Sequence, residues 1–107
     1  MIFIAIGKIA VASPGTPVKV SATDIPCNRI QFAVDPGDTG KTYVGSAGMN
    51  ATTKAGVARI FSAPSAGPQD GMPVPPPPGG GNTHNLAHYY VDAEVAGNGP
   101  LVGYWVV

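Results

Sequence analysis

The chain has 107 residues, of which six are basic and six acidic, so its formal net charge is zero. This length suits one domain, and the balanced charge removes the attraction that supplies most non-specific nucleic-acid binding. The single cysteine, Cys27, excludes an internal disulfide, and no window approaches the roughly 20 apolar residues of a membrane-spanning helix. We therefore expect a single domain over residues 1–107 that binds neither nucleic acid nor membrane.

The first predicted strand lies within residues 2–11 and is apolar on both faces. Such a pattern is typical of a central strand or of a strand covered by a partner. Ala10-Val11-Ala12 imitates a signal-peptidase site, but the segment lacks a charged start and Lys8 interrupts it. We therefore expect a protein that is made and used without export.

The middle of the chain alternates apolar and polar residues with a period of two, which predicts half-buried antiparallel strands. In residues 28–34, Ile30, Phe32 and Val34 point one way while Arg29 and Gln31 point the other. Similar short strands are expected over residues 17–22, 41–45 and 57–62.

Residues 63–83 are rich in proline and glycine and predict one long loop inserted between strands. A linker between two domains is excluded, because the remaining C-terminal piece of about 25 residues is too small to bury a core. Within the loop, Pro75, Pro76, Pro77 and Pro78 predict a stiff polyproline II rod. The rod is either a bare surface loop or an arm that contacts another protein subunit, since the basic flanks of an SH3 or WW ligand are missing.

Residues 86–95 alternate again, with His88, Tyr90, Asp92 and Glu94 on the polar face. A turn at Gly97-Asn-Gly-Pro100 leads to a final strand over residues 101–107 that is apolar on both faces. About seven strands separated by Gly/Pro turns predict an all-β, single-domain jelly roll or antiparallel β-sandwich.

Residues Gly37–Thr42 end like a phosphate-binding loop, but Asp35 stands where that loop needs its first glycine, and no helix pattern follows. A plain turn is the better interpretation. Cys27 has no base beside it in the sequence and is expected to be a small buried hydrophobe.

His84, His88 and Asp92 are spaced by four, which on a helix would align three metal ligands. The alternation of this segment favours a strand, so we expect a solvent-facing or subunit-facing polar strip instead. Asp92 and Glu94 could form a glycosidase pair, but no groove of stacked aromatics accompanies them. We expect no catalytic residue, no cofactor and no metal, and therefore no enzyme.

Three blocks of the chain resemble a type of small virion protein found in tailed bacteriophages. The blocks are Gly15–Ala22 (GTPVKVSA), Ile25-Pro-Cys27 with Ile30-Gln-Phe32, and Thr39–Met49 (TGKTYVGSAGM). The ending, His88–Val95 followed by a turn and Val102-Gly-Tyr104, fits the same pattern of strand, tight turn and closing strand. The resemblance implies a compact β domain, commonly a jelly roll, that decorates capsids as a cement or staple protein.

What the resemblance implies for function is a structural protein on the outer capsid surface of the virion, made in the host cytoplasm. It would stabilise the shell by bridging neighbouring subunits of the major capsid protein, and it would form a homo-oligomer, with a dimer slightly favoured over a trimer. The residues expected at protein contacts are Ile2, Phe3, Ile4 and Ile6, then Pro75, Pro76, Pro77 and Pro78, and finally His88, Tyr90 and Asp92.

Two other functions stay open. One is a tail, neck or fibre-associated β module present at low copy number. The other is a carbohydrate-binding module of the virion surface, which would use Tyr43, Tyr89, Tyr90, Tyr104 or Trp105. Against the second, Tyr89 and Trp105 fall on faces that are expected to be buried.

Overall fold

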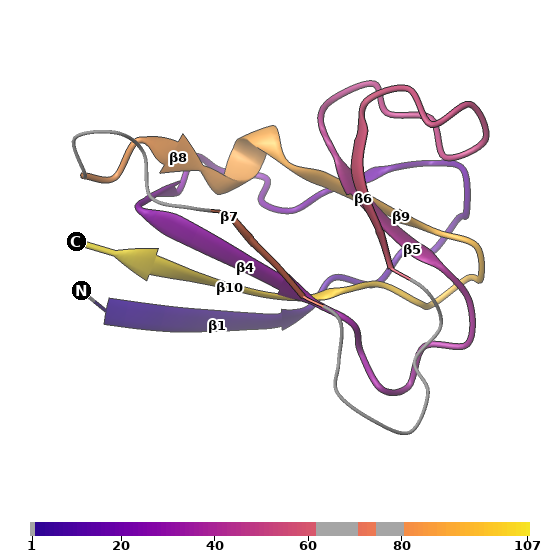
Figure 1. The fold of residues 1–107 in the computed structure, drawn as a ribbon, viewed down its shortest axis with the longest axis horizontal. Helices are drawn as coiled ribbons and strands as arrows, with labels where there is room; N and C mark the ends of the chain where they lie inside the picture. Colours follow the sequence, from indigo (N-terminus) through magenta and orange to yellow (C-terminus); the bar gives the residue numbers. More distant parts are fainter. Residues whose placement is uncertain (1, 62–70, 75–80) are drawn as a thin grey trace.

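Ten strands and one short 3₁₀ helix make up the part of the chain that the computed structural model describes, residues 2–61, 71–74 and 81–107 (Figure 1). In chain order the elements are β1 (Ile2–Lys8), β2 (Val18–Lys19), β3 (Pro26–Cys27), β4 (Arg29–Ala33), β5 (Thr42–Gly45), β6 (Val57–Phe61), β7 (Gly71–Val74), β8 (His84–Asn85), η1 (Leu86–His88), β9 (Tyr90–Ala93) and β10 (Leu101–Val106).

The strands form two four-stranded sheets and one small ribbon. Sheet A has the order β1-β10-β4-β7, sheet B has the order β2-β9-β5-β6, and β3 pairs with β8 in the ribbon. Every pairing is antiparallel. The predicted all-β fold with antiparallel sheets is therefore confirmed.

The strand pairs nest inside one another along the chain. The first strand pairs with the last, β2 with β9, β3 with β8, β4 with β7, and β5 with β6 at the centre. The chain thus runs as one long hairpin, and two further pairings, β10 with β4 and β9 with β5, join its arms into the two sheets. As a consequence, the N-terminal and C-terminal strands lie side by side, with both chain ends at one end of the molecule (Figure 1).

Both sheets contribute to a single hydrophobic core. Ile30 and Phe32 of β4 are fully buried, as the alternation of residues 28–34 predicts, and they pack with Val44 and Val91 of sheet B. The rings of Phe32 and Tyr89 lie 5.8 Å apart between centroids. The outward side chains of β4 alternate with these and are only half-buried, so one face of sheet A is left outside the core.

The first and last strands take different positions in sheet A, although both sequences predict a central strand or a strand covered by a partner. The final strand, β10, is central in sheet A, between β1 and β4. The strand β1 lies at the edge of the sheet, so a central position for it is wrong. Its apolar residues are not enclosed by the described part of the chain.

The predicted loop over residues 63–83 is not one continuous loop. Gly71–Val74 forms β7 within the predicted loop, and β7 pairs with β4, with Val74 opposite Ile30. The strand β8 (His84–Asn85) begins directly after residue 83, where the predicted loop ends. Because β7 is an edge strand, its Pro73 does not need to donate a hydrogen bond to a second neighbour. The rod residues Pro75 to Pro78 lie outside the described residues.

The predicted strand over residues 86–95 is shorter, with a 3₁₀ turn before it. Asn85 caps η1, since its Oδ1 accepts from the N–H of Ala87 (2.9 Å) and also from that of Ile25 (3.2 Å). This capping holds Leu86 in the core, where it is fully buried, and the strand begins only at Tyr90. Residues 86–89 therefore lie outside the strand, because a local side-chain bond favours the 3₁₀ turn there.

Candidate protein interface

The edge strand β1 carries the most continuous exposed apolar surface in the described residues. Ile2, Phe3, Ile4 and Ile6 are 65%, 49%, 40% and 39% exposed, and they are four of the seven large apolar side chains that count as exposed. Soluble proteins normally protect such an edge with charged residues or proline. An apolar, unprotected edge strand indicates a surface that binds another protein.

The other edges of the two sheets carry the protection that β1 lacks. Lys19 lies in β2, Arg59 in β6 and Pro73 in β7. The only charged residue of β1 is Lys8, at its C-terminal end. Among the described edge strands of sheets A and B, residues 2–7 therefore form the only edge without a charge or a proline.

The ammonium group of Lys8 is held away from this edge. Its Nζ lies 3.1 Å from Asp35 Oδ2 and 3.3 Å from Asp38 Oδ1, in the turn that follows β4. The hydrogen bond with Asp35 raises the pKa of Lys8 above its ordinary value, and Asp38 adds to this. The N–H of Gly37 and then Lys8 lower the pKa of Asp35. Lys8 therefore does not act as a free charge that would repel a second strand.

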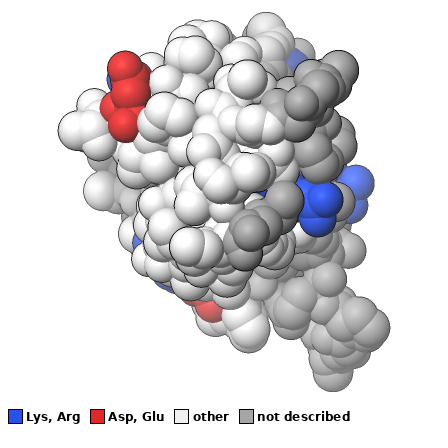
Figure 2. All heavy atoms as spheres, turned by 90° about the vertical axis from the view of Figure 1, so that its left-hand side faces the viewer, with Lys and Arg blue, Asp and Glu red and all other residues white. Residues whose placement is uncertain are grey.

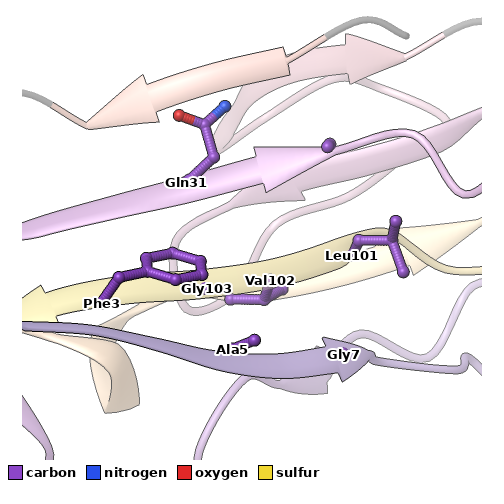
Figure 3. A pocket seen from close by; sticks show the side chains of 8 residues that line it. Phe3, Ala5, Gly7, Gln31, Leu101, Val102 and Gly103 are labelled. Carbon is purple, nitrogen blue, oxygen red and sulfur yellow. The ribbon is translucent and has the colours of Figure 1, made fainter.

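The outward face of sheet A has a shallow apolar hollow beside β1, with a volume of about 270 Å³. Small residues such as Ala5, Gly7 and Gly103 leave it open, and Phe3, Gln31 and Leu101 stand around it (Figure 3). The Phe3 ring lies over Gly103 of β10, because a Cβ built there would be only 2.4 Å from Phe3 Cζ. The ring also packs on Trp105, with 4.6 Å between centroids. Phe3 thus leans inward across β10 and leaves the free edge of β1 uncovered.

Charged groups are sparse at the end of the molecule where the chain termini lie. Figure 2 shows this end, where acidic and basic side chains appear mainly toward the margins of the visible surface. The Arg29 guanidinium lies 5.6 Å from the centre of the Trp105 ring. The apolar region around β1 is therefore bordered, rather than interrupted, by charge.

The three residues predicted to form a polar contact strip are separated by the structure. His88 is exposed at the end of η1, and Tyr90 is half-buried at the start of β9. Asp92 is fully buried, and its Oδ1 accepts from the N–H groups of Gly15 (3.1 Å) and Ala93 (2.8 Å). The expectation of an exposed Asp92 is wrong: the loop around Gly15 covers it.

The motifs that resemble chemical sites have structural explanations. In the loop between β4 and β5, Asp35 Oδ1 accepts from the N–H of Gly37 (3.0 Å), and the backbone N–H of Asp38 donates to the carbonyl of Asp35, so this is a turn. Within residues 2–61, 71–74 and 81–107, no group of three His, Cys, Asp or Glu side chains lies close enough to hold a metal. Cys27 is fully buried, as predicted, and burial raises the pKa of its thiol.

The aromatic residues considered for sugar binding are all buried or half-buried: Tyr43, Tyr89, Tyr90, Tyr104 and Trp105. Tyr89 and Tyr104 pack against the core, and Tyr43 is only 5% exposed on the outward side of sheet B. Trp105 is half-buried beneath Phe3 on the outward side of sheet A. The described residues therefore offer no platform of exposed rings on which a sugar could stack.

Sequence reasoning singled out the four apolar residues of β1, which the structure places on an exposed edge. It missed Gly103, whose lack of a side chain lets the Phe3 ring lie over β10. The signal was present, because a glycine inside an apolar strand often marks the close approach of another group. The pairing of Lys8 with Asp35 and Asp38 has no comparable local signal, since these residues lie far apart in the sequence.

The chain matches no protein-family model, no curated protein and no solved structure. In the described residues, no helix has the length and hydropathy needed to cross a membrane.

Proposed function

We propose that this protein is a non-enzymatic structural protein that decorates and stabilises a bacteriophage capsid by bridging neighbouring major capsid protein subunits. It acts on the outer surface of the virion as a homo-oligomer and needs no cofactor. The observation that carries the protein-binding part of this proposal is the apolar, uncharged edge strand β1. The capsid as the site of action is supported by the sequence blocks that resemble virion proteins.

We further propose that the fold is a jelly roll. Without the β3-β8 ribbon, eight strands remain, and numbered along the chain their orders are 1-8-3-6 in sheet A and 2-7-4-5 in sheet B. This order is the one that two Greek keys produce when a long hairpin is rolled up. The nested pairing of first strand with last supports this interpretation.

The copy number per particle tests the proposed function directly. Intact heads of the phage that encodes the chain are analysed by quantitative mass spectrometry against the major capsid protein. A decoration protein is expected at a fixed ratio to the shell subunits, on the order of a hundred copies or more, because many weak contacts act together. A few copies per particle, or loss together with the tail, would instead favour a tail, neck or fibre module.

Adding the protein back to heads that lack it tests whether β1 is needed for attachment. Heads that lack the protein are incubated with the wild-type chain, with Ile4→Glu, or with Ile60→Glu as the matched control. Ile60 is 39% exposed on β6, the edge of the other sheet, so it has nearly the exposure of Ile4. Binding by the control with loss by Ile4→Glu shows that attachment to the shell needs β1, either through direct contact with the shell or through association of copies. A screen against immobilised glycans that gives specific binding would support the carbohydrate-binding alternative.

A further inference from the structure

The backbone of β10 shows which groups of β1 remain unpaired. The carbonyl of Trp105 accepts from the N–H of Asn28, beside β4 (2.8 Å), whereas the carbonyl of Pro100 accepts from the N–H of Ile9, beside β1 (3.0 Å). Backbone groups alternate sides along an antiparallel strand. The odd-numbered residues of β10 therefore bond to β4, and the even-numbered residues bond to β1.

The register between β1 and β10 shows which residues of β1 bond to β10. Ile2 and Ile4 lie opposite even-numbered residues of β10, so their backbone groups bond within the protomer. Phe3 and Ala5 consequently direct their N–H and C=O groups to the free edge. A register shift between Ala5 and Gly7 ends this regular edge, and Gly7 again lies opposite an even-numbered residue.

One antiparallel pairing of β1 with a second copy of itself uses all of these free groups. It places Phe3 opposite Ala5 of the second copy, Ala5 opposite Phe3, and Ile4 opposite Ile4 on a twofold axis. Both bonded pairs then exchange two hydrogen bonds each. A pairing centred on Ala5 would place Phe3 opposite Gly7, which bonds to β10, so only the central pair could form hydrogen bonds. A pairing centred on Phe3 would place Ala5 opposite residue 1, which lies outside the described residues.

The side chains fit the same register. On the outward face of sheet A, the large Phe3 meets the small Ala5 of the second copy. On the other face, Ile4 meets its own copy, and Ile2 lies at the level of Ile6, beside the register shift, so the side chains brought together are apolar. The lean of Phe3 onto Gly103 keeps its ring out of the path of the incoming strand.

Charge and area agree with a second copy as the occupant. Because residues 2–7 are uncharged and Lys8 is bound to Asp35 and Asp38, two copies meet without like-charge repulsion. The exposed parts of Ile2, Phe3, Ile4 and Ile6 form a patch on the order of 400 Å² on each copy. Together with the paired backbones, two such patches approach the roughly 1,000 Å² of a specific interface. The area suits a dimer of modest affinity.

We infer that the protein forms a twofold dimer by antiparallel pairing of β1 with β1 of a second copy, centred on Ile4, which extends sheet A across both protomers. This inference deepens the proposed function, since it rests on β1 as the protein-binding edge and assigns that edge to a second copy of the chain.

Disulfide crosslinking tests the register. In a pair without mutual hydrogen bonds the Cα atoms lie about 4.5 Å apart, which is within disulfide range. Ile4→Cys is therefore expected to give a covalent dimer on mild oxidation. Ile2→Cys is the control, because in this register two copies of position 2 are offset by four residues, about 13 Å. The native Cys27 is fully buried and does not compete. Equal crosslinking at both positions, or none at position 4, would overturn the register.

Light scattering after gel filtration, from about 1 to about 200 µM, tests the dimer itself. The wild type is expected to pass from monomer to dimer over this range. Ala5→Pro removes an N–H group that has no partner in the protomer, and Ile4→Glu places two carboxylates together in the dimer. Each variant is expected to raise the dissociation constant of the dimer about tenfold or more. The control Ile60→Glu is expected to leave the dissociation constant unchanged. Circular dichroism checks that each variant is folded.

A wild type that stays monomeric throughout this range, with no crosslinking at position 4, would refute the dimer. The proposed function is judged separately by the copy number on intact heads. A monomeric protein present at high copy number on heads would refute the dimer but not the capsid function. A dimeric protein absent from heads would refute the capsid function but not the dimer.

Discussion

Replacing Asn98 with alanine tests the contact that joins the turn before β10 to the loop before β5. Asn98 is 8% exposed, and its Oδ1 accepts from the N–H groups of Thr39 (2.8 Å) and Gly40 (3.0 Å), which lie 59 and 58 residues away. Alanine removes the acceptor and leaves both donors in place. The expected result is a loss of stability without a change of fold.

The size of the loss follows from the burial of the two donors. A buried N–H group left without an acceptor costs about 1–3 kcal/mol. The bond from Gly40 is buried, so its full cost applies, whereas the bond from Thr39 is only partly buried and water can replace it in part. We expect Asn98→Ala to lower the free energy of unfolding by about 2–4 kcal/mol, a large share of the 5–15 kcal/mol typical of a domain.

Urea unfolding, followed by circular dichroism and by the fluorescence of the single tryptophan, measures this loss. Asn82→Ala is the matched control, because Asn82 also makes two bonds to the backbone, with the N–H and the carbonyl of Val107, but at an exposed site. The control is expected to lose less than about 1 kcal/mol. Equal losses in the two variants would show that burial of the donors does not set the cost, and the reasoning would fail.

Three further predictions concern acid, thiol chemistry and packing. The folded pKa of Asp35 lies below its ordinary value of 3.8, so the ionised carboxylate stabilises the folded state above that pH, and this stabilisation is lost as the pH falls through the folded pKa. The urea midpoint of the wild type should therefore fall in acid, and it should fall less steeply in Asp35→Asn. Cys27, fully buried with a raised pKa, should react with a thiol reagent only after unfolding, and rapid labelling of the folded protein would contradict its burial. Gly103→Ala should displace the Phe3 ring at a cost of about 1–3 kcal/mol and change Trp105 fluorescence, and an unchanged spectrum would show that the ring contact is absent.

The fold class was predictable because alternation along the chain reports burial directly. Ile30 and Phe32 alternate with Arg29 and Gln31, and the first pair is fully buried while the second is half-buried. Such a pattern needs only the period of the strand and the presence of one core. It predicts which face a residue takes within a strand but not which strand is its neighbour.

The position of β1 could not be predicted from its own residues. A strand that is apolar on both faces is equally suited to the centre of a sheet and to an edge covered by a partner. Here the pairing of β10 with β4 decides the matter, and those residues lie about 70 positions apart in the register. The burial of Asp92 has a similar origin, since the loop that covers it contributes Gly15, 77 residues earlier.

The sequence did not reveal the pairing of β3, β7 or β8, although it predicted a strand over residues 17–22 around the equally short β2. β3 and β8 have two residues each, too few to show a period, and β7 contains Pro73 within a segment rich in turn residues. Local preference predicts a loop there, and pairing with β4 overrides it.

The nested topology explains why the apolar character of β1 bears on association rather than on folding alone. A long hairpin brings its two ends together, so β10 covers one side of β1, and β4 occupies the other side of β10. In the described sheets nothing further lies beyond β1. Charged residues at positions 2–6 would have kept this edge apart from other chains at little cost to the core, since Ile2, Phe3, Ile4 and Ile6 are already about 40–65% exposed. The sequence has isoleucine and phenylalanine there, and Lys8 is bound to two aspartates. That choice of residues favours contact with another chain.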